Sequence, residues 1–173
     1  YGDVHYIGKN LVKTILSNNG YTVIDLGKQV PAETIIAKAV EVNADAIGLS
    51  ALLVSTSRQM PLIVNELHRR GLKFPVLIGG AAINRRFGRR ILKTESGDWY
   101  PGGVFYCKDA FEALGVMDEL SKTEGKTALL TRNQQEADAE AANTRTEDTP
   151  ATLPARSNIQ PAQTIPTPTK WGV

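Results

Sequence analysis

The chain has 173 residues, with 42% apolar residues, 22% charged residues and a formal net charge of +2, which is typical of a soluble globular protein with one ordinary core. No run of Lys and Arg stands out, so neither composition nor charge favours a nucleic-acid partner. No apolar run is long enough to span a bilayer, no signal-peptide pattern opens the chain, and the single cysteine, Cys107, fits a reducing compartment, so we expect a cytoplasmic protein without a membrane segment.

Short apolar runs alternate with amphipathic segments from residue 1 to about residue 121. This alternation is typical of an α/β fold in which helices cover a parallel sheet. We predict a Rossmann-like (flavodoxin-like) doubly wound parallel sheet. The predicted strands are residues 21–26, 45–50, 75–79 and 104–107. The first predicted helix is residues 7–19, closed by Asn18-Asn19-Gly20 as a C-terminal stop. The others are a helix that begins at Pro31 and residues 58–70, 86–92 and 109–120.

The loop that carries Asp3 and His5 precedes the first predicted helix, and in a doubly wound sheet such a loop follows a strand. Only Tyr1 and Gly2 are left for that strand. We therefore expect the first strand to be truncated and the natural protein to have residues upstream.

The composition changes near Lys122 to Thr, Ala, Glu, Asn, Gln and Pro, which is typical of linkers. We predict a domain boundary here, between an α/β domain at 1–121 and a flexible linker or tail at 122–173 that leads to a following domain. Residues 127–142 could form a frayed helix, but they lack a continuous apolar stripe that would dock it. A simple disordered end is the alternative.

Ligands in open α/β sheets bind at the carboxyl ends of the strands. His5 is the histidine predicted at that edge, because His68 falls within a helix. Asp3 lies near enough to accept the Nδ1 proton of His5 and to leave Nε2 free for a metal. A lone imidazole suits a cofactor that brings its own equatorial nitrogens. For His5 without its neighbours, a loop histidine that caps backbone groups remains the alternative.

Three motifs follow the truncated first strand and the predicted strands 45–50 and 75–79, in that order: Asp3-x-His5-x-x-Gly8, Ser50-x-Leu52 and Gly79-Gly80. Together they resemble the signature of cobalamin-binding domains. Further segments resemble the cobalamin domain of methionine synthases in particular. These segments are Ile7-Gly-Lys-Asn10, Asp25-Leu-Gly27, Val30-Pro-Ala-Glu33, Val42-Asn-Ala-Asp45 and Ile47-Gly-Leu-Ser50. The resemblance covers residues 1 to about 121.

This resemblance implies cobalamin bound base-off, with His5 as the lower axial ligand to cobalt and a hydrogen-bonded triad of His5, Asp3 and Thr56. Thr56 replaces the family's usual Ser but keeps the hydroxyl, whereas Tyr6 replaces a common Asp. The residues implied to contact the cofactor are Gly2, Asp3, Val4, His5, Tyr6, Gly8, Ser50, Leu52, Val54, Gly79, Gly80 and Ala110. Taken alone, Gly79-Gly80 is also typical of a tight turn, and we expect Cys107 to pack in the core.

The resemblance further implies that methylcobalamin carries a methyl group from 5-methyltetrahydrofolate to homocysteine within a multidomain methyltransferase. The partners would be other domains of the same polypeptide, namely a helical cap and the folate, homocysteine and reactivation domains. The isolated chain should therefore bind the cofactor without turning over. The alternatives are a corrinoid protein of another methyltransferase system, a cobalamin-dependent mutase subunit, a cobalamin-based sensor, and a cofactor-free α/β interaction module.

Overall fold

The computed structural model describes residues 4–147, and the side chains of residues 9–143 within them. Its sheet has three parallel strands in the order β1-β2-β3. These are β1 (Ile47–Ser50), β2 (Val76–Gly79) and β3 (Val104–Tyr106). Each strand lies within a predicted strand, and the predicted parallel sheet is confirmed.

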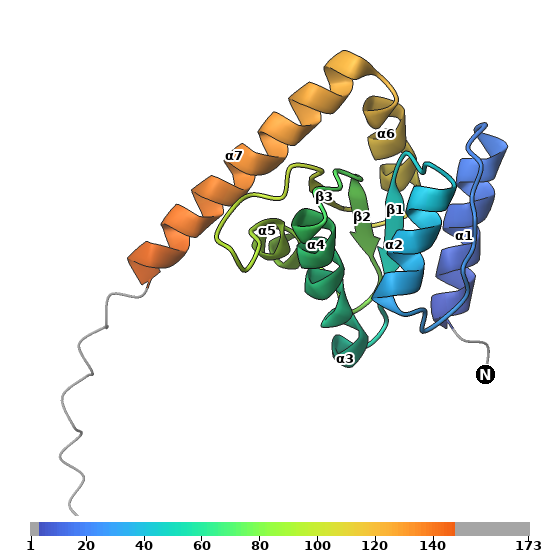
Figure 1. The fold of residues 1–173 in the computed structure, drawn as a ribbon, viewed down its shortest axis with the longest axis horizontal. Helices are drawn as coiled ribbons and strands as arrows, with labels where there is room; N and C mark the ends of the chain where they lie inside the picture. Colours follow the sequence, from blue (N-terminus) through green and yellow to red (C-terminus); the bar gives the residue numbers. More distant parts are fainter. Residues whose placement is uncertain (1–3, 148–173) are drawn as a thin grey trace, which may run out of the picture.

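Helices cover both faces of this sheet (Figure 1). They are α1 (Val4–Asn18), α2 (Ala32–Glu41), α3 (Val54–Ser57), α4 (Gln59–Arg69), α5 (Arg85–Leu92), α6 (Ala110–Leu120) and α7 (Thr123–Glu147). None of these helices within residues 4–147 has the length and apolar character needed to cross a bilayer.

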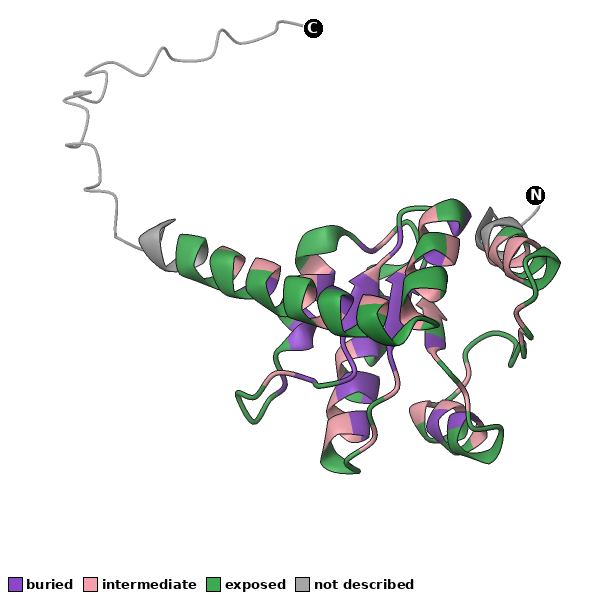
Figure 2. Cartoon of the chain, turned by 90° about the horizontal axis from the view of Figure 1, so that it is seen from above, coloured by how far each residue is buried: buried purple, intermediate pink, exposed green. Residues whose placement is uncertain are grey.

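Alternate residues of β2 point to opposite faces of the sheet, as the pleat of a strand requires. Val76 and Ile78 pack in one core cluster with residues of α2, α4 and α5. Leu77 packs in a second cluster, beside residues of α1 and α6. Figure 2 shows the buried strands between the two helical layers. The doubly wound architecture is therefore confirmed.

The predicted strand at residues 21–26 is not formed, and this segment pairs with no strand of the described sheet. Ile24 and Leu26 remain 47% and 37% exposed. In a flavodoxin-like doubly wound sheet, the second strand pairs with the first. The residues assigned to that first strand, Tyr1 and Gly2, lie outside the described part of the chain. An alternating pattern forms a strand only where a neighbour satisfies its backbone N–H and C=O groups.

Helix α1 begins at Val4, three residues before the predicted start, so His5 lies in the first helical turn instead of a loop. Its predicted end at Asn18-Asn19-Gly20 is confirmed. Gly20 has a φ of 89°, and the Tyr21 N–H donates to the Leu16 carbonyl over 3.1 Å. This is the left-handed stop that glycine favours at the end of a helix.

Residues predicted as the start of a flexible linker form the 25-residue helix α7, which packs against the domain through side chains between Leu129 and Glu140. Leu129 and Ala137 are buried. Between them, Asn133 donates to the Val104 carbonyl over 3.0 Å and accepts from the Val104 N–H over 3.3 Å. The expectation that nothing docks this helix is therefore wrong. The face of α7 that contacts the domain includes the polar residue Asn133, and a search for a continuous apolar stripe cannot detect such a face.

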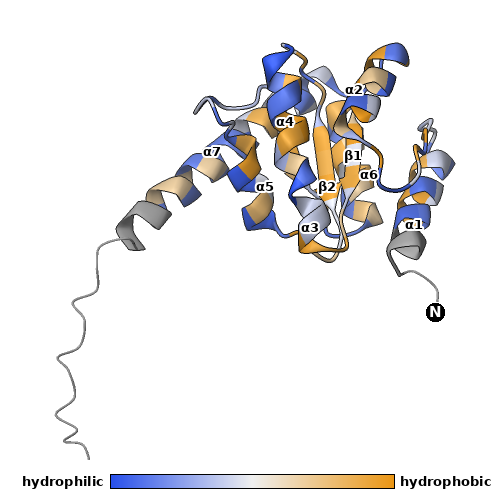
Figure 3. Cartoon of the chain, turned by 60° about the horizontal axis from the view of Figure 1, so that its bottom comes forward, coloured by the Kyte–Doolittle hydropathy of each residue, from blue (hydrophilic) through white to orange (hydrophobic). Residues whose placement is uncertain are grey.

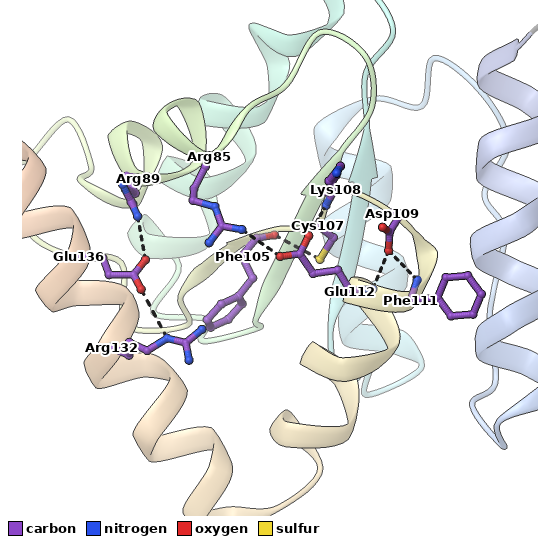
Figure 4. Close-up of polar contacts among 10 residues, drawn as sticks. All are labelled: Arg85, Arg89, Phe105, Cys107, Lys108, Asp109, Phe111, Glu112, Arg132 and Glu136. Carbon is purple, nitrogen blue, oxygen red and sulfur yellow. Dashed lines mark hydrogen bonds and ion pairs between the residues drawn. The ribbon is translucent and has the colours of Figure 1, made fainter.

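Ion pairs also join α7 to α5 (Figure 4). Arg89 on α5 donates to Glu140 over 2.6 Å and to Glu136 over 3.0 Å, and these two carboxylates raise the pKa of Arg89. Arg132, one turn before Glu136, contacts the same carboxylate at 3.5 Å. Residues 148–173 lie outside the described part of the chain, so the boundary near residue 121 and the linker role of the tail stay predictions.

We predict that Asn133→Ala lowers the free energy of unfolding by about 1–3 kcal/mol, because the Val104 N–H and C=O at the edge of β3 lose their partner. Urea unfolding measures this change. The control is Gln135→Ala, an exposed position on the same helix, which should change stability by less than about 0.5 kcal/mol. Equal effects of the two substitutions would contradict a specific contact to β3.

Candidate functional site

The carboxyl ends of the three strands meet at one edge of the sheet. The Ala51 N–H donates to the Gly79 carbonyl over 3.0 Å, and the Cys107 N–H donates to the Ile78 carbonyl over 2.9 Å. These bonds continue the strand pairing one residue beyond β1 and β3. The predicted site residues Ser50 and Gly79 therefore lie side by side, where the two strands end.

Gly79 and Gly80 form a turn that packs directly on neighbouring backbone. Gly80 has a φ of +109°, and a Cβ added there would lie 2.3 Å from the Ala51 carbonyl oxygen. A Cβ on Gly79 would lie 2.9 Å from the Cys107 carbonyl oxygen. Only glycine fits such approaches. The role observed for this pair is thus the close joining of the three strand ends.

Apolar side chains are exposed at the same edge. Leu52, Leu53 and Val54, which follow β1, expose 39%, 60% and 66% of their surface, and Phe111, which follows β3, exposes 72%. Figure 3 shows the hydrophobic colour at α3, and in Figure 4 the Phe111 ring projects from the start of α6. Large exposed apolar side chains gathered at one place mark ligand or protein contact surfaces.

The sequence prediction did not include Leu53 and Phe111. The signal that could have found them is their place: each is apolar and follows a buried strand within a few residues, at the edge where ligands bind. Periodicity alone assigns such residues to a core.

The remaining predicted residues after the strands differ in exposure. Ser50 and Thr56 are exposed, Thr56 on the short helix α3, while Ala110, the first residue of α6, is 2% exposed. Helix α3 lies between the predicted strand 45–50 and the predicted helix 58–70, where the sequence predicted neither. Ser57, the neighbour of Thr56, is buried and donates to the Val54 carbonyl over 2.7 Å. Thr56 is thus directed away from the core, and Ala110 offers a ligand no exposed side chain.

Four predicted residues, Val4, His5, Tyr6 and Gly8, lie in the first two turns of α1. Figures 1 and 3 place the start of α1 at the same end of the molecule as α3. The side chains of these four residues lie outside the described part of the chain, as do Gly2 and Asp3 altogether. The triad of His5, Asp3 and Thr56 therefore remains a prediction.

Cys107 and His68 lie where the sequence indicated. Cys107 is buried, its Sγ lies 3.8 Å from the Phe105 carbonyl oxygen, and burial raises the pKa of its thiol to about 12. A thiol of that pKa is inert at neutral pH, so Cys107 contributes packing. His68 lies on α4, away from the strand ends, with its Nε2 3.8 Å from Asp98.

The chemistry of this edge fits the cofactor that the resemblance implies. Cobalamin has a broad corrin ring, with apolar faces and both methyl and amide groups at its rim, and a polar nucleotide tail. Leu52, Val54 and Phe111 present exposed apolar surface that suits the corrin ring. Ser50 places an exposed hydroxyl residue at the end of β1 that suits the nucleotide tail. Sites for organic cofactors combine such apolar walls with a few polar groups.

Comparison with known proteins agrees with this fit. The model of the family described as "B12 binding domain" matches residues 1–91. The methionine synthase of Mycobacterium tuberculosis (strain ATCC 25618 / H37Rv) is 36% identical over 189 residues, covering 99% of this chain. That match is 16% of the relative's length, so the chain spans about one sixth of the curated relative.

Two solved structures share the fold. The methanol:cobalamin methyltransferase complex MtaBC of Methanosarcina barkeri matches with a TM-score of 0.61 and 32% identity, over 70% of this chain and 44% of that chain. A cobalamin-binding protein of Desulfitobacterium hafniense DCB-2 matches with a TM-score of 0.58 and 30% identity, over 69% and 54%.

We predict that Gly80→Ala lowers the free energy of unfolding by about 2–4 kcal/mol, because the new Cβ is both strained and in contact with the Ala51 backbone. Thermal and urea unfolding measure the loss. Gly115→Ala is the matched control: a Cβ at this exposed position of α6 meets nothing within 4 Å, and alanine should stabilise the helix by about 0.5–1 kcal/mol. If Gly80→Ala has wild-type stability, the described turn is wrong.

Proposed function

This chain belongs to the B12-binding domain family, and we propose that it is the domain on which a cytoplasmic methionine synthase carries its cobalamin. The observation that carries the proposal is the exposed apolar edge formed by Leu52, Val54 and Phe111 at the strand ends. The likeness to the methionine synthase of Mycobacterium tuberculosis, which extends over 99% of the chain, supports this choice of enzyme.

When bound base-off, cobalamin would supply a cobalt centre that accepts a methyl group from 5-methyltetrahydrofolate and passes it to homocysteine. His5, in the first turn of α1, would hold the cobalt through Nε2. Asp3 accepts the Nδ1 proton of His5 and so fixes the tautomer and orientation of the imidazole.

Thr56 completes the relay between this pair and water. It is exposed on α3, so its hydroxyl can exchange a proton with solvent and pass one toward Asp3. A proton that reaches His5 competes with axial coordination, because a protonated imidazole has no lone pair for a metal. The three residues thereby couple proton uptake to release of the axial ligand.

The other predicted residues hold the cofactor at the sheet edge. Leu52 and Val54 form an apolar wall, and Ser50 offers its hydroxyl to the nucleotide tail. Gly79 and Gly80 leave the surface above the strand ends free of side chains, while the buried Ala110 contributes through its backbone. Val4, Tyr6 and Gly8, on the first two turns of α1, would complete the contacts to the cofactor together with Gly2, which lies outside the described residues.

The substrates would bind to other domains of the same polypeptide. The methionine synthases that this chain matches are about six times longer, since the match covers 16% of their length. We propose that a helical cap and the folate, homocysteine and reactivation domains lie in the remaining length, and that this domain alone does not turn over.

A corrinoid protein of another methyltransferase system is the second candidate. The structural match to the methanol:cobalamin methyltransferase complex, at a TM-score of 0.61, favours this alternative over a mutase subunit or a sensor. Assay of the complete protein with methyltetrahydrofolate and homocysteine, and with methanol in their place, separates the two candidates.

We predict that the chain loaded with hydroxocobalamin and reduced to Co(II) shows nitrogen splitting from a protein imidazole in its paramagnetic-resonance spectrum. When histidine is labelled with nitrogen-15, this splitting should change accordingly, and His5→Gly should abolish the labelled splitting because it removes the imidazole nitrogen. The control, His68→Gly, changes a histidine of α4 away from the strand ends and should leave the splitting intact. An unchanged spectrum in His5→Gly would refute the axial assignment.

We predict that Thr56→Val weakens cobalamin binding about tenfold, the lower end of the effect seen when a hydrogen-bonding partner behind a metal ligand is removed. Valine has nearly the shape of threonine but no hydroxyl, and the position is exposed, so stability should not change. Equilibrium titration with hydroxocobalamin measures the affinity. Thr56→Ser, which keeps the hydroxyl, should bind like the wild type, and equal losses in both variants would remove the hydroxyl from the network.

A further inference from the structure

Lys9 of the motif Ile7-Gly-Lys-Asn10 and the motif Asp25-Leu-Gly27 have no part in the proposed site, yet the structure brings them together. Lys9 of α1 forms an ion pair with Asp25 and donates to the Gly27 carbonyl over 2.6 Å. Asp25 in turn accepts from the Gly27 N–H over 2.8 Å. Figure 1 shows the segment after α1 running back along that helix. We call Lys9, Asp25 and Gly27 the Lys9–Asp25 clamp.

The clamp is closed and partly shielded from water. The side chains of Lys9 and Asp25 are only 28% and 24% exposed. The bond from Lys9, followed by the bond from the Gly27 N–H, lowers the pKa of Asp25, so the carboxylate is charged at neutral pH. Gly27 has a φ of +95°, which turns the chain so that both its N–H and its C=O face the pair. Such a local network is more rigid than a single surface ion pair.

The clamp lies one helical turn from the proposed cobalt ligand. Residues four apart share one face of a helix, and Lys9 is four residues after His5. Among the described side chains of α1, Lys9 makes the polar contact nearest to that first turn. The rest of the helix is held separately, because Val12, near the middle of α1, packs against the core beside α6, and Tyr21, three residues after its end, donates to Asp118 of α6 over 2.5 Å.

We infer that Lys9 and Asp25 are positioning residues that hold the first turn of α1, and with it His5, at the height required for axial coordination; this inference rests on the proposed function. The contacts to α6 fix the part of α1 that is distant from the cofactor. The clamp fixes the end near the cofactor by tying it to the turn at Gly27. Coordination geometry tolerates little displacement of a ligand, so supporting contacts matter as much as the ligand itself.

The first test needs no cofactor. Hydrogen exchange of the backbone amides of residues 5–12 is followed in the apoprotein for the wild type, Lys9→Met and Asp25→Asn. Asparagine keeps an acceptor for the Gly27 N–H but loses the charge, so Asp25→Asn isolates the ion pair. Both variants should exchange about fivefold faster in this segment, as expected for the loss of a partly shielded ion pair, while amides of α4 keep their rates.

The second test measures coordination. In the Co(II) form loaded from hydroxocobalamin, Lys9→Met and Asp25→Asn should show about a fivefold lower ratio of imidazole-bound to imidazole-free cobalt, and Lys9→Arg should restore the wild-type ratio. The control is Lys38→Met, which breaks an exposed pair of α2 in which Lys38 and Glu41 lie 3.0 Å apart, and it should change neither measurement.

The outcomes distinguish the positioning role of Lys9 and Asp25 from the assignment of His5 as the cobalt ligand. If His5→Gly abolishes the nitrogen splitting but Lys9→Met and Asp25→Asn keep the wild-type ratio, the positioning role is wrong while the proposed function stands. If His5→Gly itself has no effect, the axial assignment fails and the inference fails with it. If Lys9→Met and Asp25→Asn unfold the whole domain, the clamp supports the fold in general, and the specific role is overturned.

Discussion

Gly80 lies so close to the backbone of Ala51 that a Cβ at this position would come within 2.3 Å of the carbonyl oxygen. This contact sets the geometry of the whole carboxyl edge. It allows the Ala82 N–H to donate to the Ala51 carbonyl over 3.2 Å, which fixes the turn after β2 against the end of β1. The exposed residues that follow β1 start from this fixed point, and with them the apolar surface that we assign to cobalamin.

The two faces of the sheet differ in the size of the hydrophobic core that each one covers. The larger cluster, beneath α2, α4 and α5, contains most of the fully buried side chains, including Ile36, Val64 and Ile78. The face covered by α1 and α6 has a much smaller core around Leu77. The helix that carries the proposed ligand is therefore attached by fewer apolar contacts than the helices opposite.

The sequence correctly predicted those structural features whose physical cause lies within one short segment of the chain. Apolar runs predicted β1, β2 and β3, and the Asn18-Asn19-Gly20 stop predicted the end of α1. It failed where the cause lies in a distant segment. Residues 21–26 have the pattern of a strand but pair with no strand of the described sheet. Helix α7 docks through Asn133, whose partner Val104 is 29 residues away.

The sequence by itself determined the fold class, the family and the strand ends where a cofactor would bind, because hydrophobic periodicity and glycine placement are local properties. The tertiary structure decided which side chains share that edge. It showed that Gly79 and Gly80 accommodate neighbouring backbone, that Ala110 is buried whereas Phe111 is exposed, and that Lys9 meets Asp25. These facts depend on contacts between segments far apart in the chain, and no local pattern specifies the distance between two such segments.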